Sequence, residues 1–112
     1  MEILQRVITK SELANMANQV FGDMVKAVVD IETGQMEVDA ELHADLEEML
    51  LHAGSQRKNL WGINLYPDAD EESFIEFDSL INIRPNQNNR GRYVYDEATR
   101  RKISEVVNQW TE

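Results

Sequence analysis

The sequence predicts an α+β fold, in which a small antiparallel sheet is built from hairpins and two main helices pack on one face of that sheet. Three observations support this prediction. Apolar residues recur at helical spacing in residues 10–21 and again after Asp96. Segments typical of strands lie between these helices, and a Glu-Thr-Gly turn joins two of them directly. Tight hairpins require antiparallel strands, which favours the α+β class. From the chain length, we expect residues 1–112 to form a single domain.

The first predicted elements are a strand at residues 3–8 and a helix at residues 10–21. The strand is apolar and ends in β-branched residues. Thr9 and Glu12 have the spacing of a capping box, in which each side chain bonds to the other's backbone N–H. Gly22 follows the last apolar residue of the helix and is typical of a left-handed helix end.

A hairpin is predicted next. The valine-rich segment 24–31 is expected to form a strand, and the turn at 32–34 leads into residues 35–45, where apolar and polar residues alternate strictly. This alternation predicts one dry face and one acidic face. Eleven extended residues would span about 36 Å, which exceeds the ~26 Å width of a domain this size. We therefore expect the strand to bend or break near Asp39–Ala40.

The second half of the chain continues the same pattern of short elements. Asp45 is expected to cap a short helix that Gly54 ends. The remaining predicted elements are strands at 60–66 and 74–78, a polar loop at 85–92, and a final helix capped by Asp96.

The net charge of −10 disfavours nucleic acids and anionic membranes as partners. The charge is uneven, since residues 1–83 carry 17 acidic and 5 basic side chains (−12), whereas residues 84–102 carry 6 basic and 2 acidic ones (+4). The chain has no cysteine, no long apolar run and no signal-peptide pattern at its start. These features favour a cytoplasmic location.

Several short segments together resemble a known family. They are His43-Ala44-Asp45, Trp61-Gly62-Ile63-Asn64-Leu65-Tyr66-Pro67, Phe77-Asp78-Ser79, Asn82-Ile83-Arg84-Pro85, Gln87 and Asn89-Arg90. With these segments the chain resembles a family of small prokaryotic proteins classed as a domain of unknown function, over nearly its whole length. The resemblance implies a single small cytoplasmic domain, and it supplies no catalytic residue, cofactor or substrate.

One candidate site is a metal centre. On a strand, Glu41, His43 and Asp45 would project from the same side and present a carboxylate, an imidazole and a carboxylate to zinc or manganese. With Asp78 as a further ligand and Arg84 as an anion clamp, these residues would suit a metal-dependent hydrolase. No other cofactor is expected. The alternative is a solvated acidic sheet face in which Asp45 only caps its helix.

The second candidate is the basic loop that follows the last predicted strand. Its candidate ligand-binding residues, together with one polar residue from strand 60–66, are Arg84, Gln87, Asn89, Arg90, Arg92 and Asn64. Arginine forks suit carboxylate or phosphate. This favours a non-catalytic binding module that contacts a small anionic ligand, an acidic protein surface or the acidic sheet face of a second copy in a homodimer.

A structural role for the same loop stays open. Its polar side chains could bond the loop's own backbone, with Arg84 paired to Asp78 or Glu76, and Asn64 bonded to Asn82 or Arg84. The positions of these side chains distinguish the hydrolase from the binding module. A hydrolase requires its histidine, aspartates and arginine in one pocket, whereas a binding module leaves them scattered or paired in simple salt bridges.

Overall fold

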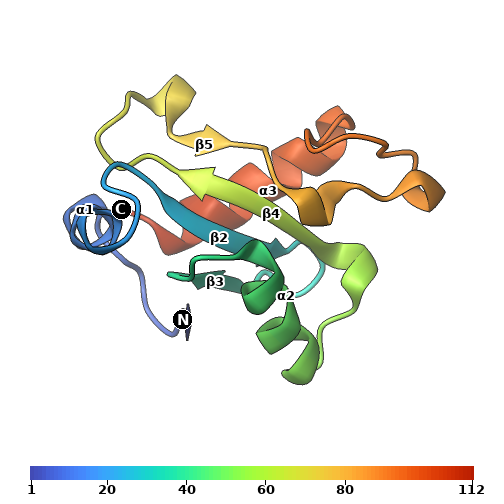
Figure 1. Cartoon of the computed structure of the whole chain (residues 1–112), viewed down its shortest axis with the longest axis horizontal. Helices are drawn as coiled ribbons and strands as arrows, with labels where there is room; N and C mark the ends of the chain where they lie inside the picture. Colours follow the sequence, from blue (N-terminus) through green and yellow to red (C-terminus); the bar gives the residue numbers. More distant parts are fainter.

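A computed structural model describes residues 1–112 and contains a five-stranded antiparallel sheet with three α-helices (Figure 1). The strands lie in the order β1-β3-β2-β4-β5. Their bounds are Glu2–Ile3 for β1, Val25–Asp30 for β2, Met36–Val38 for β3, Leu60–Leu65 for β4 and Ile75–Glu76 for β5. The helices are α1 (Lys10–Gln19), α2 (His43–His52) and α3 (Glu97–Trp110). The predicted α+β class is confirmed.

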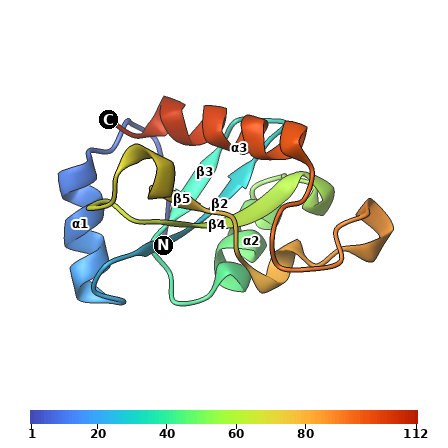
Figure 2. The ribbon, with the colours of Figure 1, turned by 90° about the horizontal axis from the view of Figure 1, so that it is seen from above.

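The sheet separates two apolar cores. Alternate residues of β2 and β4, such as Val29 and Ile63, enter a large core to which α1 and α3 both contribute. The other face of the same strands contributes Val28 and Leu60 to a small core beneath α2. Figure 2 shows α3 and α2 on opposite sides of the sheet. The prediction that two main helices pack on one face of the sheet is therefore confirmed by α1 and α3. The short helix α2 covers the other face, which was expected to be acidic and exposed to solvent. No helix has the length and apolar character needed to cross a membrane.

The start of α1 follows the predicted capping box. The backbone N–H of Glu12 donates to the Thr9 hydroxyl at 3.0 Å, and the Glu12 carboxylate accepts from the backbone N–H of Thr9 at 3.3 Å. The chain leaves the helix through Gly22, whose φ of +93° is unstrained only for glycine. The predicted opening strand is shorter than expected, because β1 ends at Ile3 and Ile8 makes only an isolated bridge to Thr111.

The β2–β3 hairpin turns through Gly34, with φ +79°, as its Glu-Thr-Gly sequence predicts. The expected break also occurs, since Asp39 adopts φ +75° and ends β3. The strand does not resume after the break. The chain instead enters α2 at His43, with Leu42 rather than Asp45 at the N-cap position. The helix is favoured there because it buries its own apolar side chains in the small core, which an extended strand could not do.

Two predictions about residues 35–45 are therefore wrong. Glu41, His43 and Asp45 do not project from one side of a strand, because His43 and Asp45 belong to α2. The alternating polar side also fails to form an exposed acidic face. Glu37, in the middle of β3, is 0% exposed, and both its carboxylate oxygens lack a hydrogen-bond partner. Burial raises the pKa of Glu37 to about 7.

Candidate functional site

Arg84 is turned into the protein and is only 6% exposed. Its guanidinium donates to the carbonyls of Ile81 (3.1 Å), Arg57 (2.7 Å) and Leu60, and to the Glu47 carboxylate at 3.3 Å. It also lies over the indole ring of Trp61, 4.8 Å from the ring centroid. The guanidinium therefore holds the segment before β4 against the polar loop, with four hydrogen bonds to groups of the chain itself. Neither Asp78 nor Glu76, the partners expected from the sequence, is bonded to it.

Asn89 is also structural. Its side-chain amide donates to the carbonyls of Asn82 (2.7 Å), Gly91 (3.1 Å) and Tyr93 (2.8 Å), and its oxygen accepts from the backbone N–H of Tyr95 at 3.0 Å. Because its amide nitrogen and its oxygen both bond to backbone groups, this buried side chain sets the shape of the loop.

The other loop residues point outward to different degrees. Gln87 donates to the Lys58 carbonyl at 3.1 Å. Arg90 is exposed and makes no ion pair or side-chain hydrogen bond within the chain. Arg92 is exposed too, but its Nε and Nη2 donate to the two oxygens of Asp78 at 2.8 and 3.2 Å. Of the predicted ligand-binding arginines, Arg90 and Arg92 thus remain accessible.

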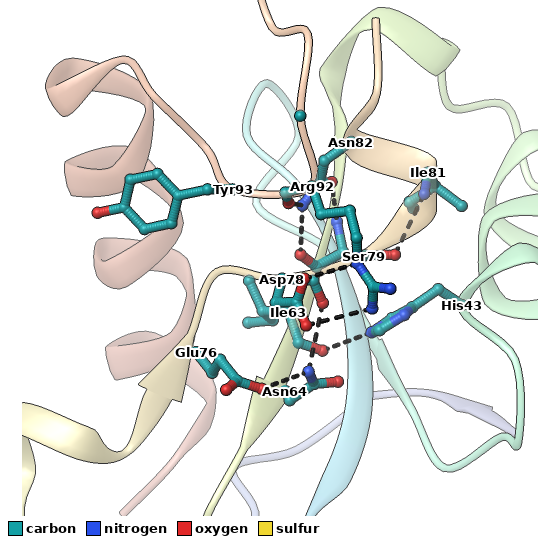
Figure 3. Close-up of polar contacts among 12 residues, drawn as sticks. His43, Ile63, Asn64, Glu76, Asp78, Ser79, Ile81, Asn82, Arg92 and Tyr93 are labelled. Atoms are coloured by element: carbon teal, nitrogen blue, oxygen red, sulfur yellow. Dashed lines mark hydrogen bonds and ion pairs between the residues drawn. The ribbon is translucent and has the colours of Figure 1, made fainter.

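Asn64 lies on β4, beside the Asp78–Arg92 ion pair (Figure 3). Its side-chain amide donates to the Glu76 carboxylate at 2.8 Å and to the Asp78 carbonyl at 3.2 Å, so neither Asn82 nor Arg84 is its partner. Its side-chain oxygen is buried and has no partner. Asn64 therefore positions the segment that carries Asp78 rather than the loop itself.

His43, the first residue of α2, comes close to the same ion pair (Figure 3). It is 7% exposed, and its Nε2 lies 2.7 Å from the carbonyl oxygen of Ile63. Burial lowers the pKa of His43, and the nearby charges of Lys26 and Arg92 lower it further, against the opposing effects of the Ile63 carbonyl and Asp78. The imidazole is therefore neutral at physiological pH.

A hollow of about 130 Å³, the α2 cavity, lies beside His43. Its lining residues are Lys26, Leu42, His43, Ala44, Ser79, Leu80, Ile81 and Arg92. The cavity thus contains the start of α2, where no side chain caps the helix, together with two basic side chains. The first backbone N–H groups of a helix have no partner within it, and they carry partial positive charge. The cavity therefore has a basic lining although the whole chain is acidic.

A second hollow of about 800 Å³, the β5 groove, lies on the other side of the ion pair. Its lining residues are Tyr66, Ala69, Glu72, Ser73, Ile75, Glu76, Phe77, Asp78 and Tyr93. Asp78 faces this acidic and aromatic groove, whereas Arg92 lines the α2 cavity. The ion pair therefore forms the boundary between an acidic hollow and a basic one.

The proposed metal ligands do not converge. No group of three or more histidine, cysteine, aspartate or glutamate side chains could hold a metal ion. Asp45 lines a separate shallow hollow with Glu48 and His52, and Glu41 is exposed. Of the residues suggested for a hydrolase, only His43 and Asp78 come close together.

Sequence reasoning missed Lys26, Ser79 and the start of α2 as parts of this site. Lys26 did carry a signal, since it is the only basic residue of the valine-rich strand β2, directly opposite Asn64 in the β2–β4 register. Two polar residues on facing apolar strands indicate a polar site on that face of the sheet. Ser79 and the helix start gave no comparable signal.

The fold and site together define a small α+β domain that has a basic cavity at a helix N-terminus. The chain belongs to the family described as "Protein of unknown function (DUF5674)", which it matches over residues 2–110. No curated protein and no solved structure matches it.

Proposed function

We propose that this protein is a non-catalytic binding module that holds a small anionic ligand in the α2 cavity. One observation carries the proposal, namely that Lys26, Arg92 and the uncapped start of α2 line the same small hollow. Helix N-termini and arginine side chains both favour phosphate and carboxylate groups. The anionic ligand expected from the basic loop is retained, but its site moves from the loop as a whole to its last arginine.

The donors in the cavity support an anion of compact shape. Asp78 engages only Nε and Nη2 of Arg92, so Nη1 has no partner within the chain. The backbone N–H groups of His43 and Ala44 lack a protein acceptor as well. The volume of about 130 Å³ holds a few water molecules. A phosphate or carboxylate group fits this space, and the remainder of a larger ligand would extend into solvent.

The pairing of the other polar residues supports binding rather than hydrolysis. Arg84 is bonded to Glu47 and to backbone carbonyls, and Asp78 is bonded to Arg92. A hydrolase built on these residues would instead need them gathered around one substrate. The absence of cysteine supports a reducing compartment, and we place the protein in the cytoplasm on that basis.

Calorimetric titration with sodium phosphate at constant ionic strength tests the proposal. Arg92→Gln removes one charged donor, and we expect it to weaken phosphate binding tenfold or more. Arg90→Gln is the matched control, because Arg90 is an exposed arginine of the same loop outside the cavity. The Asp78–Arg92 pair is exposed enough that its loss costs at most about 1 kcal/mol of stability. Equal losses in both variants, or none in either, would refute the proposed site.

A second copy of this chain is a further candidate partner. Arg90 is exposed and unpaired, and the acidic residues Asp68, Asp70, Glu71 and Glu72 make no ion pair within the chain. Contact between these surfaces would be weakened by salt. Sedimentation at low and high ionic strength measures it. A mass that stays at 13.0 kDa in both conditions would exclude the homodimer.

A further inference from the structure

We propose that the α2 cavity selects an oxyanion that still carries a proton at neutral pH, of which inorganic phosphate is the common example, over sulfate. This inference rests on the proposed function, since it names the anion that the same cavity prefers. It depends on an acceptor atom of His43, a residue that lines the cavity.

The protonation of His43 follows from its hydrogen bond. A backbone carbonyl can only accept, so Nε2 must donate its hydrogen to Ile63, whose oxygen is 2.7 Å away. A neutral imidazole carries one hydrogen, and Nδ1 therefore keeps its lone pair. No group of the chain donates to Nδ1, and His43, a residue only 7% exposed, lines the cavity. The unpartnered atom is an acceptor that a ligand can satisfy.

The surroundings keep His43 neutral. Lys26 on β2 and Arg92 from the polar loop both oppose a positive imidazolium. The Ile63 carbonyl on β4 and Asp78, which follows β5, favour it. Burial is the largest influence and also opposes the charge. Near neutral pH, Nδ1 of His43 therefore remains an acceptor beside the basic side chains that line the cavity.

Phosphate and sulfate are both tetrahedral oxyanions, but near neutral pH only phosphate carries a hydrogen that it can donate. At pH 7.5 inorganic phosphate retains a P–O–H group, which can donate to Nδ1 of His43 while the other oxygens accept from Arg92 and the helix start. Sulfate has no hydrogen, and it would bring an oxygen lone pair against the nitrogen lone pair. Sites that hydrogen-bond a ligand hydroxyl reject analogues without it strongly, because a buried polar atom is then left unpaired. We expect phosphate to bind at least tenfold more tightly than sulfate.

The preference should depend on pH in a defined direction. Protonation of Nδ1 turns the acceptor into a donor, and a fully deprotonated anion then becomes the better match. Sulfate binding is therefore expected to strengthen as the pH falls through the lowered pKa of His43. The ratio of phosphate to sulfate affinity should shrink over the same range.

The experiment compares sodium phosphate with sodium sulfate, each titrated into the full chain at pH 7.5 and constant ionic strength. His43→Leu removes the Nδ1 acceptor, together with the donor to the Ile63 carbonyl, so the selectivity should fall to within about twofold. His52→Leu, at the exposed end of the same helix, should leave selectivity unchanged. In the unsubstituted protein, nitrogen NMR of His43 reports the tautomer directly, so the inference can be tested even if the variant does not fold.

The outcomes separate the inference from the proposed function. Phosphate-over-sulfate selectivity that His43→Leu abolishes, with hydrogen on Nε2 of His43 in the unsubstituted protein, supports both. Equal binding of phosphate and sulfate, or hydrogen on Nδ1, overturns the selectivity and leaves the anion site standing. Failure of both anions to bind overturns the proposed function and the inference together.

Discussion

Glu37 provides a direct test of the fold, because it is a buried acid with no partner. It lies at the centre of the three-residue strand β3, opposite Ile3 on one side and Val28 on the other. Both carboxylate oxygens lack hydrogen bonds, so the charged form is disfavoured by desolvation. We predict that Glu37→Gln stabilises the protein above neutral pH, because it removes the cost of burying a negative charge.

The magnitude follows from the raised pKa. The folded-state pKa of about 7 exceeds the ordinary value of 4.5 by 2.5 pH units (7 − 4.5). At 1.36 kcal/mol per unit, this difference corresponds to about 3 kcal/mol of unfolding free energy. Since the folded pKa is raised, the folded state binds the proton more tightly. The stabilisation is complete below pH 4.5 and is lost as the pH rises through about 7.

Urea denaturation at pH 5 and pH 8 measures the effect. The unsubstituted protein should lose about 2–3 kcal/mol between these pH values through Glu37, and Glu37→Gln should not lose it. Glu41→Gln is the control. Glu41 is an exposed acid four residues away, and its substitution removes the same charge as Glu37→Gln. If Glu37→Gln and Glu41→Gln change with pH alike, the reasoning about the buried carboxylate is refuted.

Three further substitutions test the polar loop and its boundary. Arg84→Lys should lower the unfolding free energy by about 3 kcal/mol, because a single ammonium cannot replace the bonds of the buried guanidinium. Urea denaturation measures this free energy, and a change below about 1 kcal/mol would contradict the buried network. Gly62→Ala should destabilise by about 1–3 kcal/mol, since its Cβ would lie 2.6 Å from that of Ser79. An unchanged thermal midpoint of unfolding would show that β4 at Gly62 is not in close contact with the segment that carries Ser79. Asp78→Asn should strengthen phosphate binding severalfold in calorimetry by freeing the charge of Arg92, and weaker binding would show that Asp78 helps to hold the anion.

The parts of the fold that sequence predicted were those set by neighbouring residues. The capping box at Thr9 and the glycine turn at Gly34 depend on three or four consecutive positions, and both occur. The break after β3 came from a length argument, which required no knowledge of the partner strands. Local chemistry was enough in each of these cases.

The fate of the arginines depended on distant residues and could not be predicted in the same way. Arg84 bonds carbonyls 24 and 27 residues away, which come within reach only once β4 and the preceding turn have folded. The start of α2 was predicted three residues too late, with Asp45 rather than Leu42 at the N-cap, because alternating polarity continued past Asp39 by coincidence. The helix began where its apolar residues could reach the sheet.

The most direct test of the central claim is a phosphate titration of the unsubstituted protein, followed by the backbone amide signals of every residue. The account predicts saturable shifts that are largest at His43 and Ala44, with further shifts at Lys26 and Arg92, and little change at Arg90. Shifts centred on Arg90, or the absence of saturable shifts at the start of α2, would contradict the claim that this helix N-terminus and its neighbouring cations form an anion site.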